Sequence, residues 1–186
     1  MSTLVVITGA SRGIGRSAAV AFAKDPRINK LSLCLIARKE DGLSQTKTMV
    51  QDAAGPEKEI ETSIHSIDLS DLDNLESDVE KVFRQQLEKD GIRYDRAILI
   101  NNAGSLGHLG SSAELPSPKE LRITVDFNFT SAVWILSYFV KYFGYEHKIK
   151  CNIVNMSSLC AVTPFRTIAM YCAGKAAVSL EGCIII

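Results

Sequence analysis

The clearest sign of how this chain folds is the stretch Leu4-Val5-Val6-Ile7-Thr8-Gly9-Ala10-Ser11-Arg12-Gly13-Ile14-Gly15. A short apolar run leads into a Gly-x-x-x-Gly-x-Gly turn, and a helical pattern follows over residues 13–24. A strand that turns through glycines into a helix is typical of the first unit of a βαβ fold. Glycines also occur in such turns for packing alone, so this loop by itself leaves a binding role open.

The rest of the chain repeats the alternation of short apolar runs and amphipathic stretches. Runs that are apolar nearly throughout suit strands covered on both faces. The sequence therefore predicts an α/β fold, a Rossmann-like doubly wound parallel sheet in three layers. The expected strands are Leu4–Thr8, Leu31–Ala37, Ser63–Ile67, Ala97–Ile100 and Asn152–Met156, and the expected helices are Gly13–Lys24, Leu43–Ala54, Leu72–Lys89, Pro118–Phe143 and Ala169–Glu181.

Size and composition indicate one ordinary globular domain. The chain has 186 residues, of which 46% are hydrophobic and 23% are charged, as in soluble proteins. Twenty-one basic residues balance twenty-one acidic ones, so no overall charge favours nucleic acid or an anionic membrane as a partner. Any recognition of phosphate must therefore be local.

The cysteines and histidines show no metal-binding or redox pattern. The five cysteines lack ligand spacing, and His65, His108 and His147 are scattered, so we expect no metal. Strand-like sequence begins at Leu4, which leaves no room for a targeting peptide, and no apolar run approaches the ~20 residues that cross a bilayer. These features predict a cytoplasmic protein.

The glycine loop is well suited to a dinucleotide, because a backbone without Cβ atoms can approach a pyrophosphate closely. The following helix offers its unpaired N–H groups to the same pyrophosphate. Where NAD enzymes often have an acidic residue, at the end of the second strand, this chain has Arg38 and Lys39. Together with Arg12, these cations favour a ribose 2′-phosphate and hence NADP(H). The alternative is that Arg38 and Lys39 form a solvated turn.

Two further turns follow expected strands and complete the candidate cofactor site. Asp68 and Leu69 follow the third strand, where a carboxylate could bind the adenine amino group or could instead form the turn that leads into a helix. Residues 101–104 follow the fourth strand and are expected to support the central part of the cofactor. The expected cofactor-binding residues are Gly9, Ala10, Ser11, Arg12, Gly13, Ile14, Gly15, Arg38, Lys39, Asp68, Leu69, Asn101, Ala103 and Gly104.

Three polar residues near the C-terminal end of the sequence suit the reduction of a carbonyl group. Tyr171 and Lys175 are four residues apart and lie on one face of a helix. An ammonium and the positive nicotinamide ring would stabilise a phenolate, so Tyr171 could donate a proton to a carbonyl oxygen as hydride reaches its carbon. Ser158 could hydrogen-bond the same oxygen, and we expect Ser158 and Tyr171 to bind the substrate. Tyr-x-x-x-Lys is common by chance, but here it stands in order with the glycine loop, the Asn-Asn-Ala-Gly turn and Ser158.

In this order of motifs the sequence resembles the short-chain dehydrogenase/reductase family, from Leu4 to about Ala177. The resemblance implies a single NADP-binding domain over residues 1–186, a homodimer, and a small-molecule carbonyl substrate. It also implies that Asn128 is a fourth catalytic residue, which kinks its helix and holds a water, although a bond to a neighbouring helix is the alternative. Tyr171 and Lys175 would join the cofactor-binding residues, since in the family the lysine binds the nicotinamide ribose.

Within the family, three stretches are similar to the reductases that act on pterin side-chain carbonyls with NADPH, late in tetrahydrobiopterin synthesis. These stretches are residues 101–107, residues 155–165 and Tyr171-Cys172-Ala173-Gly174-Lys175, in which Gly174 replaces the serine of most family members.

The likeness ends after about Ala177, because Val178–Ile186 do not follow the family pattern. Family members continue with two more strands and a segment that covers the substrate, so the expected fold lacks these. Three hypotheses remain. The chain is a pterin-type reductase, or a shortened and impaired form that at most binds cofactor or pairs with a full-length subunit, or a reductase of other diketones or aldehydes.

Overall fold

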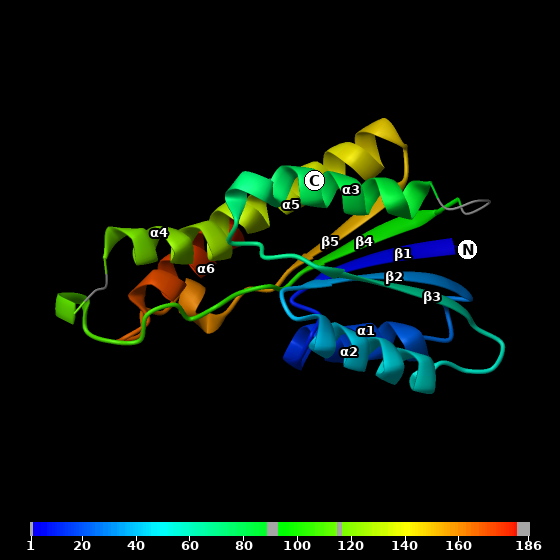
Figure 1. Cartoon of the computed structure of the whole chain (residues 1–186), viewed down its shortest axis with the longest axis horizontal. Coiled ribbons are helices and arrows are strands. Elements are labelled where there is room, and N and C mark those ends of the chain that lie inside the picture. The colour runs from blue at the N-terminus through cyan, green and yellow to red at the C-terminus, as the bar shows by residue number, and fades with distance from the viewer. Residues whose placement is uncertain (1, 89–92, 115–116, 182–186) are drawn as a thin grey trace.

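The computed structural model describes residues 2–88, 93–114 and 117–181 and has a five-stranded parallel sheet at its centre (Figure 1). The strand order is β3-β2-β1-β4-β5, and every neighbouring pair is parallel. The expected Rossmann-like fold is confirmed. The strands are β1 Ser2–Thr8, β2 Lys30–Ala37, β3 Glu59–Ser66, β4 Arg96–Asn101 and β5 Lys150–Asn155.

Helices cover both faces of this sheet and give three layers (Figure 1). On one face lie α1 Gly13–Lys24 and α2 Glu40–Ala53, and on the other α3 Leu72–Leu87 lies beside α5 Ser131–Phe139. Beyond the sheet, α4 Pro118–Val125 packs against α6 Ala169–Glu181. The remaining elements are the short helices η1 Ser112–Glu114 and η4 Leu159–Ala161 and the π-helical segments η2 Asp126–Thr130 and η3 Val140–Glu146.

The two faces of β1 supply two separate hydrophobic clusters, as the period of a strand requires. Val5 and Ile7 pack toward α1 and α2, whereas Leu4 and Val6 pack toward α3 and α5. All four side chains are fully buried. The sheet therefore anchors the loops at its carboxyl ends from both sides.

The helix expected over residues 118–143 is a longer rod with two π-helical segments, and it ends at Glu146. By length and composition alone, Pro118–Glu146 could span a membrane. Ile135, Leu136, Phe139 and Phe143 are buried in the cluster beneath α3, so this rod is a core helix of the fold.

The direction in which the sheet is built places a crevice between β1 and β4. From β1 the chain adds β2 and β3 on one side, and then returns to add β4 and β5 on the other. In open α/β sheets, ligands bind at the carboxyl ends of the strands where the order reverses. The loops that follow Thr8 and Asn101 meet at this point.

Candidate functional site

A cavity of about 750 Å³ lies at the carboxyl ends of the first four strands, within the range of ligand pockets. Its walls come from the loops after β1, β2, β3 and β4, which are far apart in the sequence. Ten of the expected cofactor-binding residues line it: Gly9, Ser11, Arg12, Gly13, Ile14, Arg38, Lys39, Leu69, Ala103 and Gly104.

The glycine loop forms one wall, and its glycines serve two different purposes. At Gly9, with φ +68°, an added Cβ would lie 2.8 Å from Asn102 Nδ2, so the loop packs tightly against the turn after β4. At Gly13, with φ +57°, an added Cβ would meet nothing within 4 Å. Gly13 also lines the cavity, so its missing Cβ leaves the backbone open to a ligand.

The turn after β4 is joined to the end of β1 by several hydrogen bonds. Thr8 Oγ1 accepts from the backbone N–H groups of Asn102 and Ala103 at 2.9 and 3.0 Å. Asn102 Nδ2 donates to the carbonyl oxygens of Thr8 and Gly9 at 2.9 and 3.3 Å. Asn102 lines the cavity but was not among the expected cofactor-binding residues. Its position in the Asn-Asn-Ala-Gly turn could have indicated it.

Asn101 does not line the cavity, and its side chain is instead hydrogen-bonded inside the fold. It is the last residue of β4 rather than part of the turn that was expected to follow the strand. Its Nδ2 donates to Ala132 O and to Asn155 Oδ1, both at 3.0 Å, and its side chain is buried. Ala10, Gly15 and Asp68 also lie outside the lining of the cavity.

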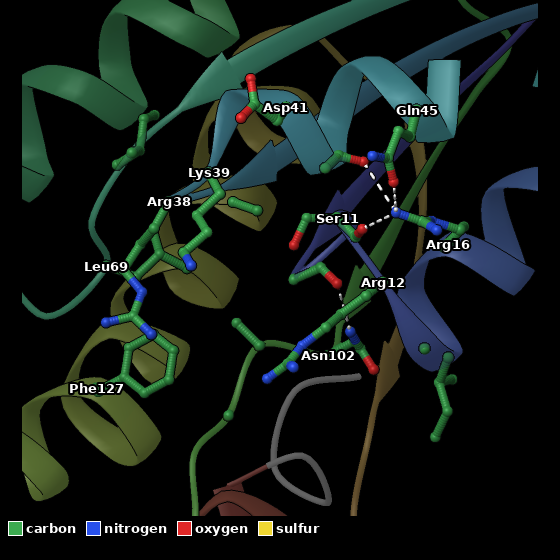
Figure 2. A pocket seen from close by; sticks show the side chains of 18 residues that line it. Ser11, Arg12, Arg16, Arg38, Lys39, Asp41, Gln45, Leu69, Asn102 and Phe127 are labelled. Carbon is green, nitrogen blue, oxygen red and sulfur yellow. Dashed lines mark hydrogen bonds between the residues drawn. The ribbon is translucent and has the colours of Figure 1, made fainter. Parts of the chain in front are cut away.

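The three cations expected from the sequence line the same cavity (Figure 2). Arg38 and Lys39 follow β2, and Arg12 lies in the glycine loop. The guanidinium of Arg38 lies over the ring of Phe127, 5.5 Å from its centroid. One carboxylate, that of Asp41 on α2, lines the cavity too, so positive charge predominates in its walls.

A fourth arginine, which the sequence analysis did not single out, holds the glycine loop to α2. Arg16 Nη2 donates to Ser11 O, and at 3.3 and 3.2 Å to Gly42 O and Gln45 Oε1 (Figure 2). Its Nε donates to Thr46 Oγ1 at 3.0 Å. These long-range partners lie some thirty residues away, where local sequence patterns give no signal.

In the turn after β3, Leu69 lines the cavity, whereas the carboxylate of Asp68 is hydrogen-bonded within the turn. Asp68 Oδ1 accepts from Ser70 N at 3.0 Å and from Ser70 Oγ at 2.7 Å, as in the helix-leading turn that was the alternative reading. Burial raises the pKa of Asp68, but the Ser70 hydrogen bonds and the charge of Arg38 outweigh it and lower the pKa overall.

Asn128 lies at the centre of the π-helical segment η2 and is 2% exposed. Its Nδ2 donates to Ser105 O at 2.9 Å and to Thr124 O at 3.0 Å, and its Oδ1 accepts from Ser105 N at 2.9 Å. The helix thus has a π-turn at Asn128, a feature common at functional sites, while the expected kink and held water stay predictions. The amide joins this helix to the loop after β4.

Lys175 and Tyr171 lie on α6, which packs against η2 and η4. Lys175 Nζ donates to Met156 O at 2.6 Å and lies 5.8 Å from the centroid of the Tyr171 ring. Lys175 is 5% exposed, and burial lowers its pKa. An added Cβ on Gly104 would lie 3.5 Å from Lys175 Nζ and 3.4 Å from Asn128 Oδ1, so both side chains lie close to Gly104, which lines the cavity. Tyr171 and Lys175, which were expected to bind the cofactor, are not themselves part of the cavity lining.

Ser158 is the N-cap of η4, where its Oγ accepts from Cys160 N at 3.2 Å. Because the hydroxyl acts as an acceptor in this bond, its proton remains available for another oxygen. Gly174 allows the close approach of α6, since an added Cβ there would lie 3.1 Å from Asn128 Cβ. The structure therefore brings the helices of Asn128, Tyr171 and Lys175 together beside the cavity.

The sequence model described as short chain dehydrogenase matches residues 3–180, nearly all of the chain. This chain belongs to the short-chain dehydrogenase family. Sepiapterin reductase of Xenopus tropicalis is 32% identical over 95% of the chain and 65% of that protein, and the Bos taurus enzyme is 35% identical over 94% and 63%. Benzil reductase ((S)-benzoin forming) of Bacillus subtilis is 30% identical over 95% of the chain and 63% of that protein. The chain thus spans about two thirds or less of the length of these relatives.

Solved structures show the same fold over about two thirds of their own chains. The bulky-bulky ketone specific alcohol dehydrogenase from Comamonas testosteroni superposes with a TM-score of 0.75 and 26% identity, over 97% of this chain and 64% of that one. An alcohol dehydrogenase from Thermococcus sibiricus, complexed with 5-hydroxy-NADP, gives a TM-score of 0.72 and 26% identity, over 97% and 68%. In residues 2–88, 93–114 and 117–181, no group of three or more His, Cys, Asp and Glu side chains could hold a metal ion.

Proposed function

We propose that this chain is an NADPH-dependent carbonyl reductase that resembles sepiapterin reductase and reduces a pterin side-chain carbonyl in the cytoplasm. The observation that carries the proposal is that Lys175 and Asn128 lie against Gly104, in the wall of a cavity whose other walls hold Arg12, Arg38 and Lys39. Gly104 thus connects the expected catalytic lysine to the cavity that the expected phosphate-binding cations line. Residues 1–186 act in this proposal as one dinucleotide-binding domain.

The cavity residues fit a dinucleotide phosphate. Gly13 leaves open space above the backbone where α1 begins, and the N-terminus of that helix favours an anion. Bound NADPH would supply hydride to the carbonyl carbon. Arg12, Arg38 and Lys39 would bind the ribose 2′-phosphate, since guanidinium groups form paired hydrogen bonds with phosphate oxygens. Leu69 lines the cavity and Asp68 does not, so we assign the adenine side of the cavity to Leu69 and its apolar neighbours.

We assign the catalytic roles to the polar side chains of η2, α6 and the N-cap of η4. Tyr171 donates its hydroxyl proton to the carbonyl oxygen, and the carbonyl is thereby reduced to an alcohol. Ser158 donates a hydrogen bond to the same oxygen and stabilises its developing charge. The ammonium of Lys175 stabilises the phenolate that remains on Tyr171. Asn128 positions the loop from Gly104 to Ser105 through its amide, beside the lysine.

Sepiapterin with NADPH is the first substrate pair to test, with NADH as the alternative reductant. The proposal predicts a kcat/KM for NADPH well above that for NADH, and loss of this preference in the double variant Arg38→Ser, Lys39→Ser. Equal use of the two reductants by the unaltered protein would contradict the cofactor assignment.

A second substrate class, aromatic diketones, is favoured by the 30% identity to benzil reductase over 95% of the chain. Benzil should be assayed beside sepiapterin at matched concentrations. Turnover of benzil without turnover of sepiapterin would move the proposal to this class and leave the roles of Tyr171 and Ser158 unchanged.

A further inference from the structure

Phe127 has an unusual position between the cofactor cavity and the catalytic helix. It lies in the π-helical segment η2, directly before Asn128, and it is half-buried. Its neighbour Asn128 turns its amide to Ser105, whereas the ring of Phe127 lines the cavity (Figure 2). Adjacent residues of one π-turn thus serve the two ends of the site.

The guanidinium of Arg38 lies over the ring of Phe127, and both side chains line the cavity. The Arg38 Cζ atom lies 5.5 Å from the ring centroid, within the range of a cation–π contact. Figure 2 shows the two groups beside each other. These residues come from the end of β2 and from the rod that begins with α4, almost ninety residues apart in the sequence.

No charged group described near Arg38 forms an ion pair that would draw its guanidinium away from the Phe127 ring. Asp68 is close enough for the charge of Arg38 to contribute to lowering its pKa, but its hydrogen bonds go to Ser70. Lys39, the next residue, lines the same cavity and is itself a cation, so it offers Arg38 no ion pair. Among the ion pairs of the described residues within 4 Å, none includes Arg38.

An aromatic face is a suitable support for an arginine that must recognise phosphate. Stacking uses the flat face of the guanidinium and leaves the N–H groups at its edge for hydrogen bonds in the plane. A side chain already held in its binding geometry also loses less conformational entropy when the ligand arrives. A support of this kind would strengthen binding of the phosphate without contacting it.

We propose that Phe127 sets the preference of this site for a 2′-phosphorylated nucleotide by holding the guanidinium of Arg38 on its ring face before the nucleotide binds. Phe127 is thus a positioning residue, which acts on the phosphate through Arg38. This inference rests on the proposed NADPH site and names a residue that sets its selectivity.

The test measures binding of 2′,5′-ADP and of 5′-AMP to the purified chain by isothermal titration calorimetry, without any turnover. Phe127→Leu keeps an apolar side chain and removes the aromatic face. The expected result is a two- to fivefold weaker affinity for 2′,5′-ADP, about the factor that an exposed cation–π contact supports, with a smaller change for 5′-AMP. Phe127→Tyr should restore the affinity because it restores the aromatic face. Phe129→Leu is the matched control, since Phe129 lies in the same π-turn and does not line the cavity.

A double-mutant cycle with Arg38→Met separates support of the arginine from simple packing against adenine. In the Arg38→Met background, Phe127→Leu should have no further effect that depends on the 2′-phosphate. An equal loss for both nucleotides, or the same loss in that background, would overturn the proposal. If Phe127→Leu does not fold, Phe127→Met provides the same comparison. Unaltered protein that binds 5′-AMP as tightly as 2′,5′-ADP would instead contradict the proposed NADPH preference itself, and the inference would fall with it.

Discussion

Gly9 and Gly13 have similar backbone conformations but different surroundings, and this difference predicts different effects of alanine. Both have positive φ, which strains a residue with a Cβ by about 1–2 kcal/mol. At Gly9 the new Cβ would also press on Asn102 and Ala103, while at Gly13 it would enter the open cavity. We expect Gly13→Ala to lower the free energy of unfolding by about 1 kcal/mol, and Gly9→Ala to lower it by more than about 2 kcal/mol.

Calorimetric binding of NADPH completes this comparison. Gly13→Ala should weaken NADPH binding by about tenfold or more, because its Cβ occupies the space assigned to the pyrophosphate. Unchanged affinity in Gly13→Ala would place the pyrophosphate elsewhere.

Lys175 predicts a pH dependence of stability. Burial lowers the pKa of Lys175, so the buried ammonium destabilises the folded protein at every pH below this lowered pKa. As pH rises, the folded protein loses this proton before the unfolded chain does. The cost therefore declines as pH rises from the lowered folded pKa toward the ordinary value of 10.5. Urea unfolding of the unaltered protein and of Lys175→Met, measured from neutral pH to about pH 10, should show the former gaining stability relative to the latter. Parallel curves would mean that the folded environment does not disfavour the charge.

Single residues also show where sequence reasoning was sufficient and where it was not. The positions of Arg12, Arg38 and Lys39 around one cavity followed from their places after the ends of strands. The hydrogen bonds of Asp68 to Ser70 and of Asn101 to Ala132 depend on local geometry and on packing, which the residue types do not reveal. Phe127 gave no signal either, since aromatic residues in a long apolar helix indicate core packing first.

Two elements, the glycine loop and α2, depend on the buried hydroxyl of Thr46. Its Oγ1 lies 2.9 Å from both Ala10 O and Gly42 O and accepts from Arg16 Nε at 3.0 Å. Thr46→Val has nearly the same shape but leaves these groups unsatisfied. It should therefore lower the free energy of unfolding by about 1–3 kcal/mol and loosen the loop that the cofactor site needs.

Urea unfolding and NADPH titration of Thr46→Val test this point, with Thr46→Ser as the control that keeps the hydroxyl. Thr46→Ser should retain most of the stability and affinity. If Thr46→Val behaved like the unaltered protein in both measurements, the hydrogen bonds of Thr46 Oγ1 would not stabilise the glycine loop against α2.

Element boundaries were predictable where the apolar pattern is strong and not where an element is exposed or irregular. The bounds of α1 and α6 agree with the expected residues, and Ser117 caps α4 through Glu120 N as the Ser-Pro pair predicts. β3 begins at Glu59, four residues before the expected start, because an edge strand accepts polar residues on its open side. The π-turns of the long rod insert residues without changing composition, so the pattern hides them.

The whole molecule reflects a parallel sheet whose connections bring distant motifs to one edge. The sequence predicted the α/β class and the order of motifs along the chain. The arrangement β3-β2-β1-β4-β5, which places the glycine loop beside the turn after β4, rests on strand pairing that a single sequence does not encode locally. The joint cavity is therefore a property of the assembled fold.

The central claim is that the phenol of Tyr171 serves as the proton donor for NADPH-dependent carbonyl reduction. The most direct measurement compares NADPH consumption with sepiapterin between the purified chain and Tyr171→Phe, with 2′,5′-ADP binding measured on both. We predict that Tyr171→Phe lowers turnover by about a hundredfold or more while the nucleotide affinity stays the same. Equal turnover of the two proteins, or no turnover by a folded chain that binds the nucleotide, would contradict the claim.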